Sequence, residues 1–196
     1  KYFNTNEVTT TSGRCMTSAY EIVSSEEIPF ESQSVATNQS YLKCVIALPT
    51  YKRYPDGNTT LSIYNYHGDS TSSAARAAQV SEILAKIATD TSDFIIVTGD
   101  TNDFPDDHPN WQSFINAGFT PVHHGETQTC TDGWSIDQIF FGPNISCLYY
   151  NVIDSRDWKY KPTPSSTPIP VSDHDFLFAD LKFDFDAVLA ARNANS

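Results

Sequence analysis

Alternating hydrophobic and polar positions in the middle of the chain predict strands separated by helices. Residues 61–67 alternate strictly, which places Leu61, Ile63 and His67 on one face of a strand. The continuous apolar run 94–98 is typical of a strand buried on both faces. Residues 1–40 are polar and show little pattern. In chain order, the predicted elements are strands 41–48 and 61–67, a helix from a cap at 70–73 to about 88, strand 94–98, helix 111–117, strands 133–141, 149–153 and 171–183, and a short terminal helix 187–194.

This order of elements predicts a single α/β domain in which sheets are buried behind helices. A length of 196 residues fits one domain, and the chain has no internal repeat. Because 39% of the residues are hydrophobic and 13% are aromatic, the composition excludes a disordered chain. No apolar run approaches the roughly 20 residues of a membrane span.

The net charge of -12 argues against a protein that binds nucleic acid mainly through a basic surface. It does not exclude an enzyme that holds phosphate through metal ions, because a bound cation inverts the local charge.

The cysteines and glycosylation sequons favour a secreted glycoprotein with disulfides. The sequons begin at Asn38, Asn58 and Asn144. Four cysteines allow three pairings, and we favour the two pairs that bracket neighbouring predicted strands, Cys15–Cys44 and Cys130–Cys147. The alternative is a cytosolic protein with four buried thiols. The first residues have no apolar signal-peptide core, so we expect that a leader was removed or that the chain is incomplete.

Polar residues stand where the core pattern of four predicted strands stops. Each alone has an ordinary explanation: Asp100 as a turn cap, His67 as a satisfied core histidine, Asp173 as an edge charge. Together they suit metal-assisted phosphoester cleavage, because carboxylates hold a hard cation and histidines transfer protons. The set comprises His67, Asp100, Asn102, Asp137, Asp173 and His174.

Five short motifs run in order between residues 61 and 183: Ile63–His67 (IYNYH), Arg76–Gln79 (RAAQ), Val97–Asn102 (VTGDTN), Ser135–Phe140 (SIDQIF) after Thr129-Cys130, and Ser172–His174 (SDH). Their order and spacing resemble those of the endonuclease/exonuclease/phosphatase superfamily, which includes DNase I, abasic-site endonucleases, inositol polyphosphate 5-phosphatases and neutral sphingomyelinases. Tyr66 stands where that family usually has Thr, and Thr101 replaces an aromatic residue or leucine. The resemblance implies a two-sheet α/β sandwich of DNase I type with its site at one rim.

The resemblance also implies a role for each site residue. His174 would activate water as the general base, and Asp137 would fix its tautomer. Asp173 would bind Mg²⁺ or Mn²⁺, and Asp100 would orient or deprotonate the nucleophile or share the metal. The remaining two would contact phosphate: Asn102 would hydrogen-bond the phosphoryl oxygens, and His67 would donate to the phosphate or to the leaving oxygen. Arg76 has two interpretations, a functional role or an arginine that snorkels from the edge of its helix's apolar face.

The chain departs from the family at its start. The family begins with a strand that carries an Asn and a segment that ends in Gln-Glu, whose Glu is the main metal ligand, and neither motif is found here. We therefore expect residues 1–196 to be the C-terminal two-thirds of such a domain, completed by an N-terminal remainder or a partner chain.

Three functions stay open at this point. The first is a secreted, metal-dependent phosphodiester hydrolase that acts on nucleic acid or phospholipid. The second is a non-catalytic glycoprotein of the same fold in an extracellular assembly, favoured by the missing Glu. The third is an unrelated lectin-like sandwich, for which the motifs would be coincidence.

Overall fold

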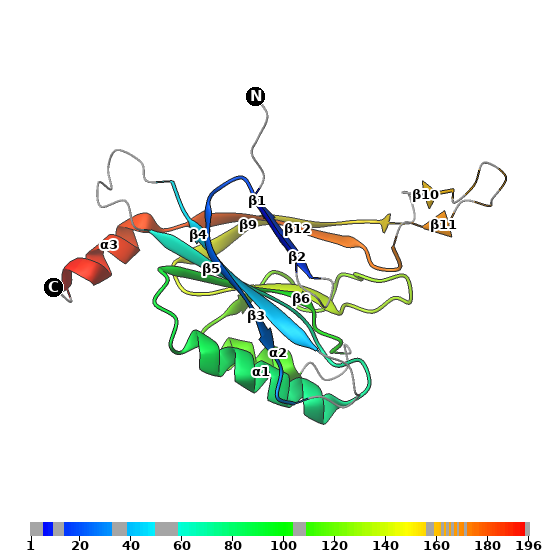
Figure 1. Ribbon diagram of the computed structural model, residues 1–196, viewed down its shortest axis with the longest axis horizontal. Coiled ribbons are helices and arrows are strands. Elements are labelled where there is room, and N and C mark those ends of the chain that lie inside the picture. The colour runs from blue at the N-terminus through cyan, green and yellow to red at the C-terminus, as the bar shows by residue number, and fades with distance from the viewer. Residues whose placement is uncertain are drawn as a thin grey trace.

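The computed structural model places a six-stranded sheet between a layer of helices and a smaller sheet (Figure 1). It describes residues 6–9, 14–32, 39–49, 59–103, 109–155, 159–161, 163, 165, 167, 169–170 and 172–194. The large sheet has the order β3 (Ile22–Pro29), β4 (Ser40–Ala47), β5 (Thr60–His67), β6 (Phe94–Asp100), β8 (Asp137–Phe141) and β7 (Thr120–Pro121). The second sheet pairs β9 (Ile145–Ile153) with β12 (Phe176–Phe183), and two short hairpins pair β1 (Asn6–Thr9) with β2 (Cys15–Ser18) and β10 (Lys159–Tyr160) with β11 (Ile169–Pro170). The predicted α/β sandwich is confirmed.

Helices α1 (Ser73–Ile87) and α2 (Pro109–Asn116) cover one face of the large sheet (Figure 1). Helix α1 begins after Ser72, whose hydroxyl accepts a hydrogen bond from the backbone N–H of Ala75 and caps the first turn. Its predicted apolar face is confirmed, since Val80 and Ile83 are buried against the sheet and Leu84 and Ile87 pack beside them.

A second core fills the space between the two sheets. Leu61, Ile96 and Phe141 of the large sheet are buried there, with Leu181 and Phe183 of β12 packed against them. Helix α3 (Phe185–Ala194) closes one end of this core through the buried Val188. The middle strands of the large sheet are thus buried on both faces, as the run 94–98 predicted.

Strand pairing lines up three polar residues across the large sheet. Strands β5 and β6 run parallel, and their register sets His67 beside Asp100. Strands β6 and β8 run antiparallel, and their register sets Asp100 beside Asp137. These residues therefore form one row at the rim where β5 and β6 end.

Two expectations are corrected. The patternless segment 1–40 contains strands β1, β2 and β3. The predicted pairings Cys15–Cys44 and Cys130–Cys147 are wrong for this structure, because all four thiols are free. Their surroundings differ, since Cys44 is buried and Cys15 is exposed. The backbone of Cys130 forms the isolated β-bridge with His174, and Cys147 of β9 stands opposite Leu181 of β12 in the strand register.

In the described part of the chain, no helix combines the length and the apolar character that crossing a membrane requires.

Candidate active site

His174 joins the polar row from the second sheet. It lies just before β12, where it forms an isolated antiparallel bridge with Cys130. Its Nδ1 is 2.9 Å from Oδ2 of Asp137, and its Nε2 is 3.7 Å from Oδ2 of Asp100. Since an ionised carboxylate only accepts hydrogen bonds, Nδ1 is the donor and neutral His174 carries its free lone pair on Nε2. This places the basic nitrogen toward Asp100.

The pKa of His174 is raised above its usual value. Partial burial by itself would lower the pKa, but the hydrogen bond and negative charge of Asp137 outweigh it, and the charges of Asp100 and Asp173 add to the increase. Protonated His174 is therefore well stabilised beside these carboxylates, as a group that accepts a proton during a reaction must be.

Thr129 fixes the strands that carry this pair. Its hydroxyl oxygen accepts hydrogen bonds from the backbone N–H groups of Ile136 (3.0 Å) and Asp137 (2.9 Å). Its carbonyl oxygen accepts a third from the N–H of Asp175 (2.8 Å), next to His174. Because Thr129 is fully buried, these bonds hold the start of β8 against the start of β12.

Asp100 is at the centre of the site. Its Oδ2 is 3.4 Å from Nε2 of His67, and its Oδ1 accepts the backbone N–H of Asn102 at 2.8 Å. Burial raises the pKa of Asp100, although that N–H and the His67 charge act in the opposite direction. The ionised carboxylate is thus short of solvation, and a cation at this position would relieve that cost.

Asn102 lies in the loop after β6 with a positive φ of 50°, a conformation that Asn tolerates better than most residues. Its side-chain N–H₂ donates to the carbonyl oxygen of Gly68 at 2.9 Å, which joins this loop to the one after β5. The side chain is buried, and its predicted contact with phosphate would use the second amide hydrogen, because phosphoryl oxygens only accept hydrogen bonds.

Among the residues that the structure describes, three could hold a metal ion. One ligand atom each from Asp100, Asp137 and His174 lie within 4.8 Å of one another. The carboxylate oxygens suit a hard divalent cation such as Mg²⁺ or Mn²⁺, whereas an imidazole nitrogen suits transition metals better, and Asp137 already bonds His174. Asp173, predicted as a ligand, is exposed and lies outside this group of described residues.

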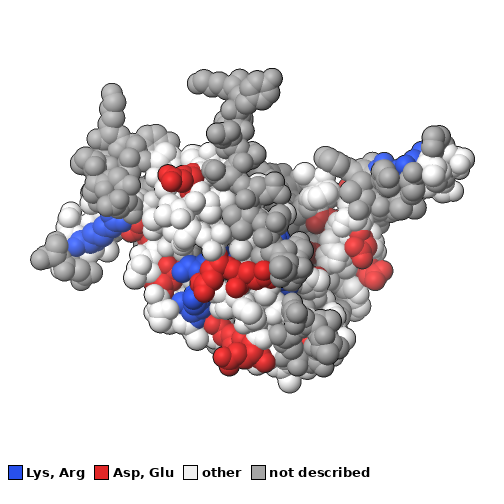
Figure 2. Space-filling model, viewed as in Figure 1, with Lys and Arg blue, Asp and Glu red and all other residues white. Residues whose placement is uncertain are grey.

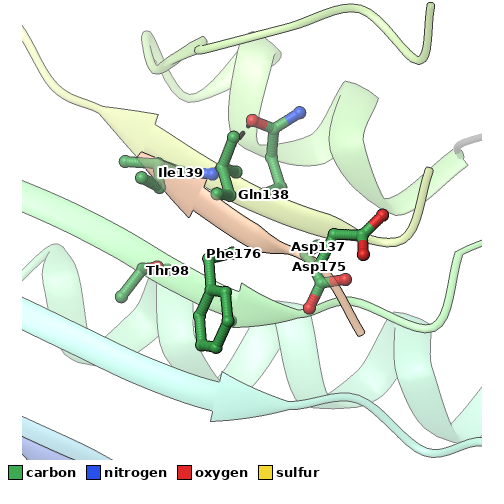
Figure 3. Close-up of a pocket in the computed structure, with 8 residues that line it drawn as sticks. Thr98, Asp137, Gln138, Ile139, Asp175 and Phe176 are labelled. Carbon is green, nitrogen blue, oxygen red and sulfur yellow. Dashed lines mark hydrogen bonds between the residues drawn. The ribbon is translucent and has the colours of Figure 1, made fainter. Parts of the chain in front are cut away.

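A cavity of about 230 Å³ opens beside the His174–Asp137 pair, between the two sheets. Figure 3 shows the Asp137 and Asp175 carboxylates at one end and the Phe176 ring in its wall. The Asp175 carboxylate accepts the backbone N–H of Ser155 at 2.8 Å. The cavity thus combines an apolar wall with two acidic groups next to the candidate base.

Acidic side chains outnumber basic ones on the face shown in Figure 2. This matches the net charge of -12. Long-range attraction of a polyanion is therefore weak, and anion binding would depend on a cation or on donors inside the site.

Two acidic residues of the site region were missed in the sequence. Asp69 and Asp103 are buried in the loops that follow β5 and β6. Asp69 stands two positions after the motif residue His67, and Asp103 directly follows the motif residue Asn102, which was the available signal. Asn144, the one predicted glycosylation site among the described residues, is exposed in the turn between β8 and β9, while Asn38 and Asn58 lie outside them.

Comparison with solved structures shows an endonuclease/exonuclease/phosphatase fold. A family protein of that name from Bacteroides thetaiotaomicron matches with a TM-score of 0.69 at 16% identity, over 93% of this chain and 76% of its own. A mannosyl-6-phosphatase from the same organism matches with a TM-score of 0.65 at 16% identity, over 92% and 77%. Sphingomyelinase C from Streptomyces griseocarneus matches with a TM-score of 0.57 at 14% identity, over 86% and 67%.

No protein-family model and no curated protein sequence matches the chain. At these identities the structural likeness establishes the fold, and the chemistry must be argued from the residues at the rim.

Proposed function

We propose that this protein is a metal-dependent phosphoester hydrolase whose substrates are phosphodiesters. The observation that carries the proposal is the His174–Asp137 pair, with Nε2 of His174 turned toward Asp100. A hydrogen-bonded His–carboxylate pair with one free nitrogen is the arrangement of a general base. The likeness in fold to a phosphatase and a sphingomyelinase supports a hydrolase of phosphate esters.

In this proposal His174 removes a proton from water at Nε2 as the water oxygen attacks phosphorus. Asp137 keeps Nδ1 protonated and stabilises the imidazolium that forms. His67, on the other side of Asp100, donates a proton or a hydrogen bond to the leaving oxygen, and the amide of Asn102 contacts a phosphoryl oxygen. A bound Mg²⁺ or Mn²⁺ would be held by Asp100 and would supply positive charge for the phosphoryl oxygens.

We also propose that the protein is secreted and glycosylated at Asn144. This asparagine is exposed and sits in a turn, and Ser146 of its sequon is exposed as well. Expression through a eukaryotic secretory pathway should give a mass that falls on enzymatic deglycosylation, and Asn144→Gln should remove one glycan. An unchanged mass after deglycosylation would contradict this assignment.

Hydrolysis of model phosphodiesters and phosphomonoesters, with Mg²⁺, with Mn²⁺ and with a chelator, tests the main proposal. We expect metal-dependent turnover of the diesters that His174→Ala abolishes. His124→Ala is the matched control, because His124 is exposed and outside the site. Turnover of monoesters alone would show that the substrates are phosphomonoesters and not phosphodiesters. Full activity of His174→Ala would overturn the mechanism. A folded protein without any turnover would favour the non-catalytic glycoprotein.

A further inference from the structure

A buried arginine links the two loops that follow β5 and β6. Arg76 of α1 is 8% exposed. Its Nη1 donates to the carbonyl oxygen of Asp69 at 2.7 Å, and its Nε donates to Oδ1 of Asp103 at 3.3 Å. One guanidinium therefore contacts the loop after His67 and the loop after Asn102. This contradicts the interpretation of Arg76 as a side chain that snorkels to solvent.

The carboxylate of Asp103 also accepts hydrogen bonds from α2. Asn110 donates to it through its backbone N–H (3.0 Å) and its side-chain amide (2.6 Å). Asp103 is 1% exposed, so its charge is offset by the guanidinium and by these donors in place of water. The pair with Arg76 thus anchors the second loop to both helices.

The two loops also contact each other directly. The N–H of Gly68 donates to the carbonyl oxygen of Asp100 at 2.8 Å, and the side chain of Asn102 donates to the carbonyl oxygen of Gly68 at 2.9 Å. A Cβ at Gly68 would collide with the backbone of Thr101, so this approach requires glycine. The loop positions are consequently coupled.

His67 depends on this coupling more than the other site residues do. Its side chain is 57% exposed, whereas that of His174 is 32% exposed and bonded to Asp137. Little packing holds the His67 ring, and His67 is the last residue of β5, so the loop that follows it influences the 3.4 Å separation between His67 and Asp100 in addition to the strand register.

We propose that Arg76 is a positioning residue, which with Asp103 holds the loop that begins after His67 against the loop that begins after Asp100, and so places the His67 side chain relative to Asp100 and Asn102. The kinetic part of this inference rests on the proposed function. A purely structural Arg76 would contribute to stability and leave the geometry of His67 unchanged.

The chain offers a matched control at the opposite end of β6. Arg192 of α3 binds Asp93, just before β6, with Nη2 2.7 Å from Oδ2 and Nε 3.1 Å from Oδ1. Arg76→Gln and Arg192→Gln therefore each break one arginine–aspartate pair beside the same strand. We expect both to lower the melting temperature. Arg76→Gln should reduce kcat at least tenfold with KM changed less than threefold, and Arg192→Gln should keep kcat within twofold of wild type.

A double-mutant cycle separates positioning from stability. If Arg76 acts through His67, then His67→Ala should cost much less in the Arg76→Gln background than in wild type, and its cost should be unchanged in the Arg192→Gln background. Additive losses in both backgrounds would overturn the proposal, as would equal kcat values for the two arginine variants.

A readout without substrate keeps this test independent of the hydrolase proposal. The ¹H–¹³C cross-peak of the His67 ring should shift in Arg76→Gln and stay in place in Arg192→Gln. An unshifted cross-peak in Arg76→Gln would refute the positioning role even if the protein hydrolyses phosphodiesters. A shift in a protein without turnover would support the positioning role and reject the hydrolase. If Arg76→Gln does not fold, the same measurements on Asp103→Asn test the positioning role, because asparagine keeps the volume of the side chain and removes its charge.

Discussion

The sharpest test of the site is Asp137→Asn. The substitution keeps the size of the side chain but removes the charge that faces Nδ1 of His174 at 2.9 Å. An asparagine can still accept a hydrogen bond through its oxygen, or it can turn its N–H₂ toward the ring and favour the wrong tautomer. In either case the imidazolium that forms when His174 takes a proton loses its counter-charge.

The expected loss follows from this contact. A hydrogen bond to a charged group contributes about 1.5–3 kcal/mol, and each ~1.4 kcal/mol in the barrier is a tenfold change in rate. If the contribution is realised mainly in the transition state, kcat/KM should fall by about 10- to 150-fold. The wrong tautomer would increase the loss beyond that range.

The pH profile supplies a second, independent readout. The proposed mechanism requires neutral His174, and the pKa of this residue is raised above 6.5, so kcat/KM of the wild type should rise with pH through a value above 6.5. Asp137 supplies the largest contributions that raise this pKa. In Asp137→Asn the rise should therefore move to lower pH while the maximum rate falls.

The assay is steady-state hydrolysis of a chromogenic phosphodiester at saturating metal, between pH 5 and 9 (roughly the range over which a histidine titrates). Asp175→Asn is the matched control: it removes one charge from the same cavity and keeps an acceptor for the Ser155 N–H. Activity of Asp137→Asn within threefold of wild type, or a loss of equal size in Asp175→Asn, would refute the assignment of Asp137 as the partner of the base.

Three further predictions concern stability. Gly99→Ala should unfold the protein or lower its stability by more than ~3 kcal/mol in chemical denaturation, because Gly99 has a φ of 141° and a Cβ would collide with the Tyr66 carbonyl. Burial by itself would raise the pKa of Asp90, but hydrogen bonds, among them one from Tyr64, lower it below 3.8. Asp90→Asn should therefore lower the free energy of unfolding at pH 7, and its difference from wild type should shrink as the pH falls below 3.8. Because the pKa of Asp100 is raised, Asp100→Asn should raise the melting temperature without metal at pH 7 and abolish any increase caused by Mn²⁺.

Much of the fold was predictable where the core is local in sequence. The strict alternation of 61–67 and the apolar run 94–98 became β5 and β6, because both strands are buried on both faces. The apolar face of the helix after them became the face of α1 that packs on the sheet. Strand β3 was missed because it is an edge strand with mostly exposed residues, and such strands carry little hydrophobic pattern.

The site was predictable as a set of residues but not as a network. Strand ends identified His67, Asp100 and Asp137, since a polar residue directly after a core pattern needs a reason. Neither the pair of Arg76 with Asp103 nor the hydrogen bonds of Thr129 follow from periodicity, because they join residues that only the tertiary fold brings together. The cysteine pairs failed for the same reason: neighbouring strands do not set the distance between two thiols.

The sheet and the loops position different parts of the site. The register of β5, β6 and β8 fixes the row from His67 through Asp100 to Asp137, and shifting any strand by one residue would send its polar group to the opposite face. A sheet buried on both faces cannot make that shift without exposing its core. The polar row is therefore held by the core of the sheet, whereas in our proposal the position of the His67 ring also depends on the loops that Arg76 and Asp103 join. Substitutions in those loops should consequently change the rate before they change the fold.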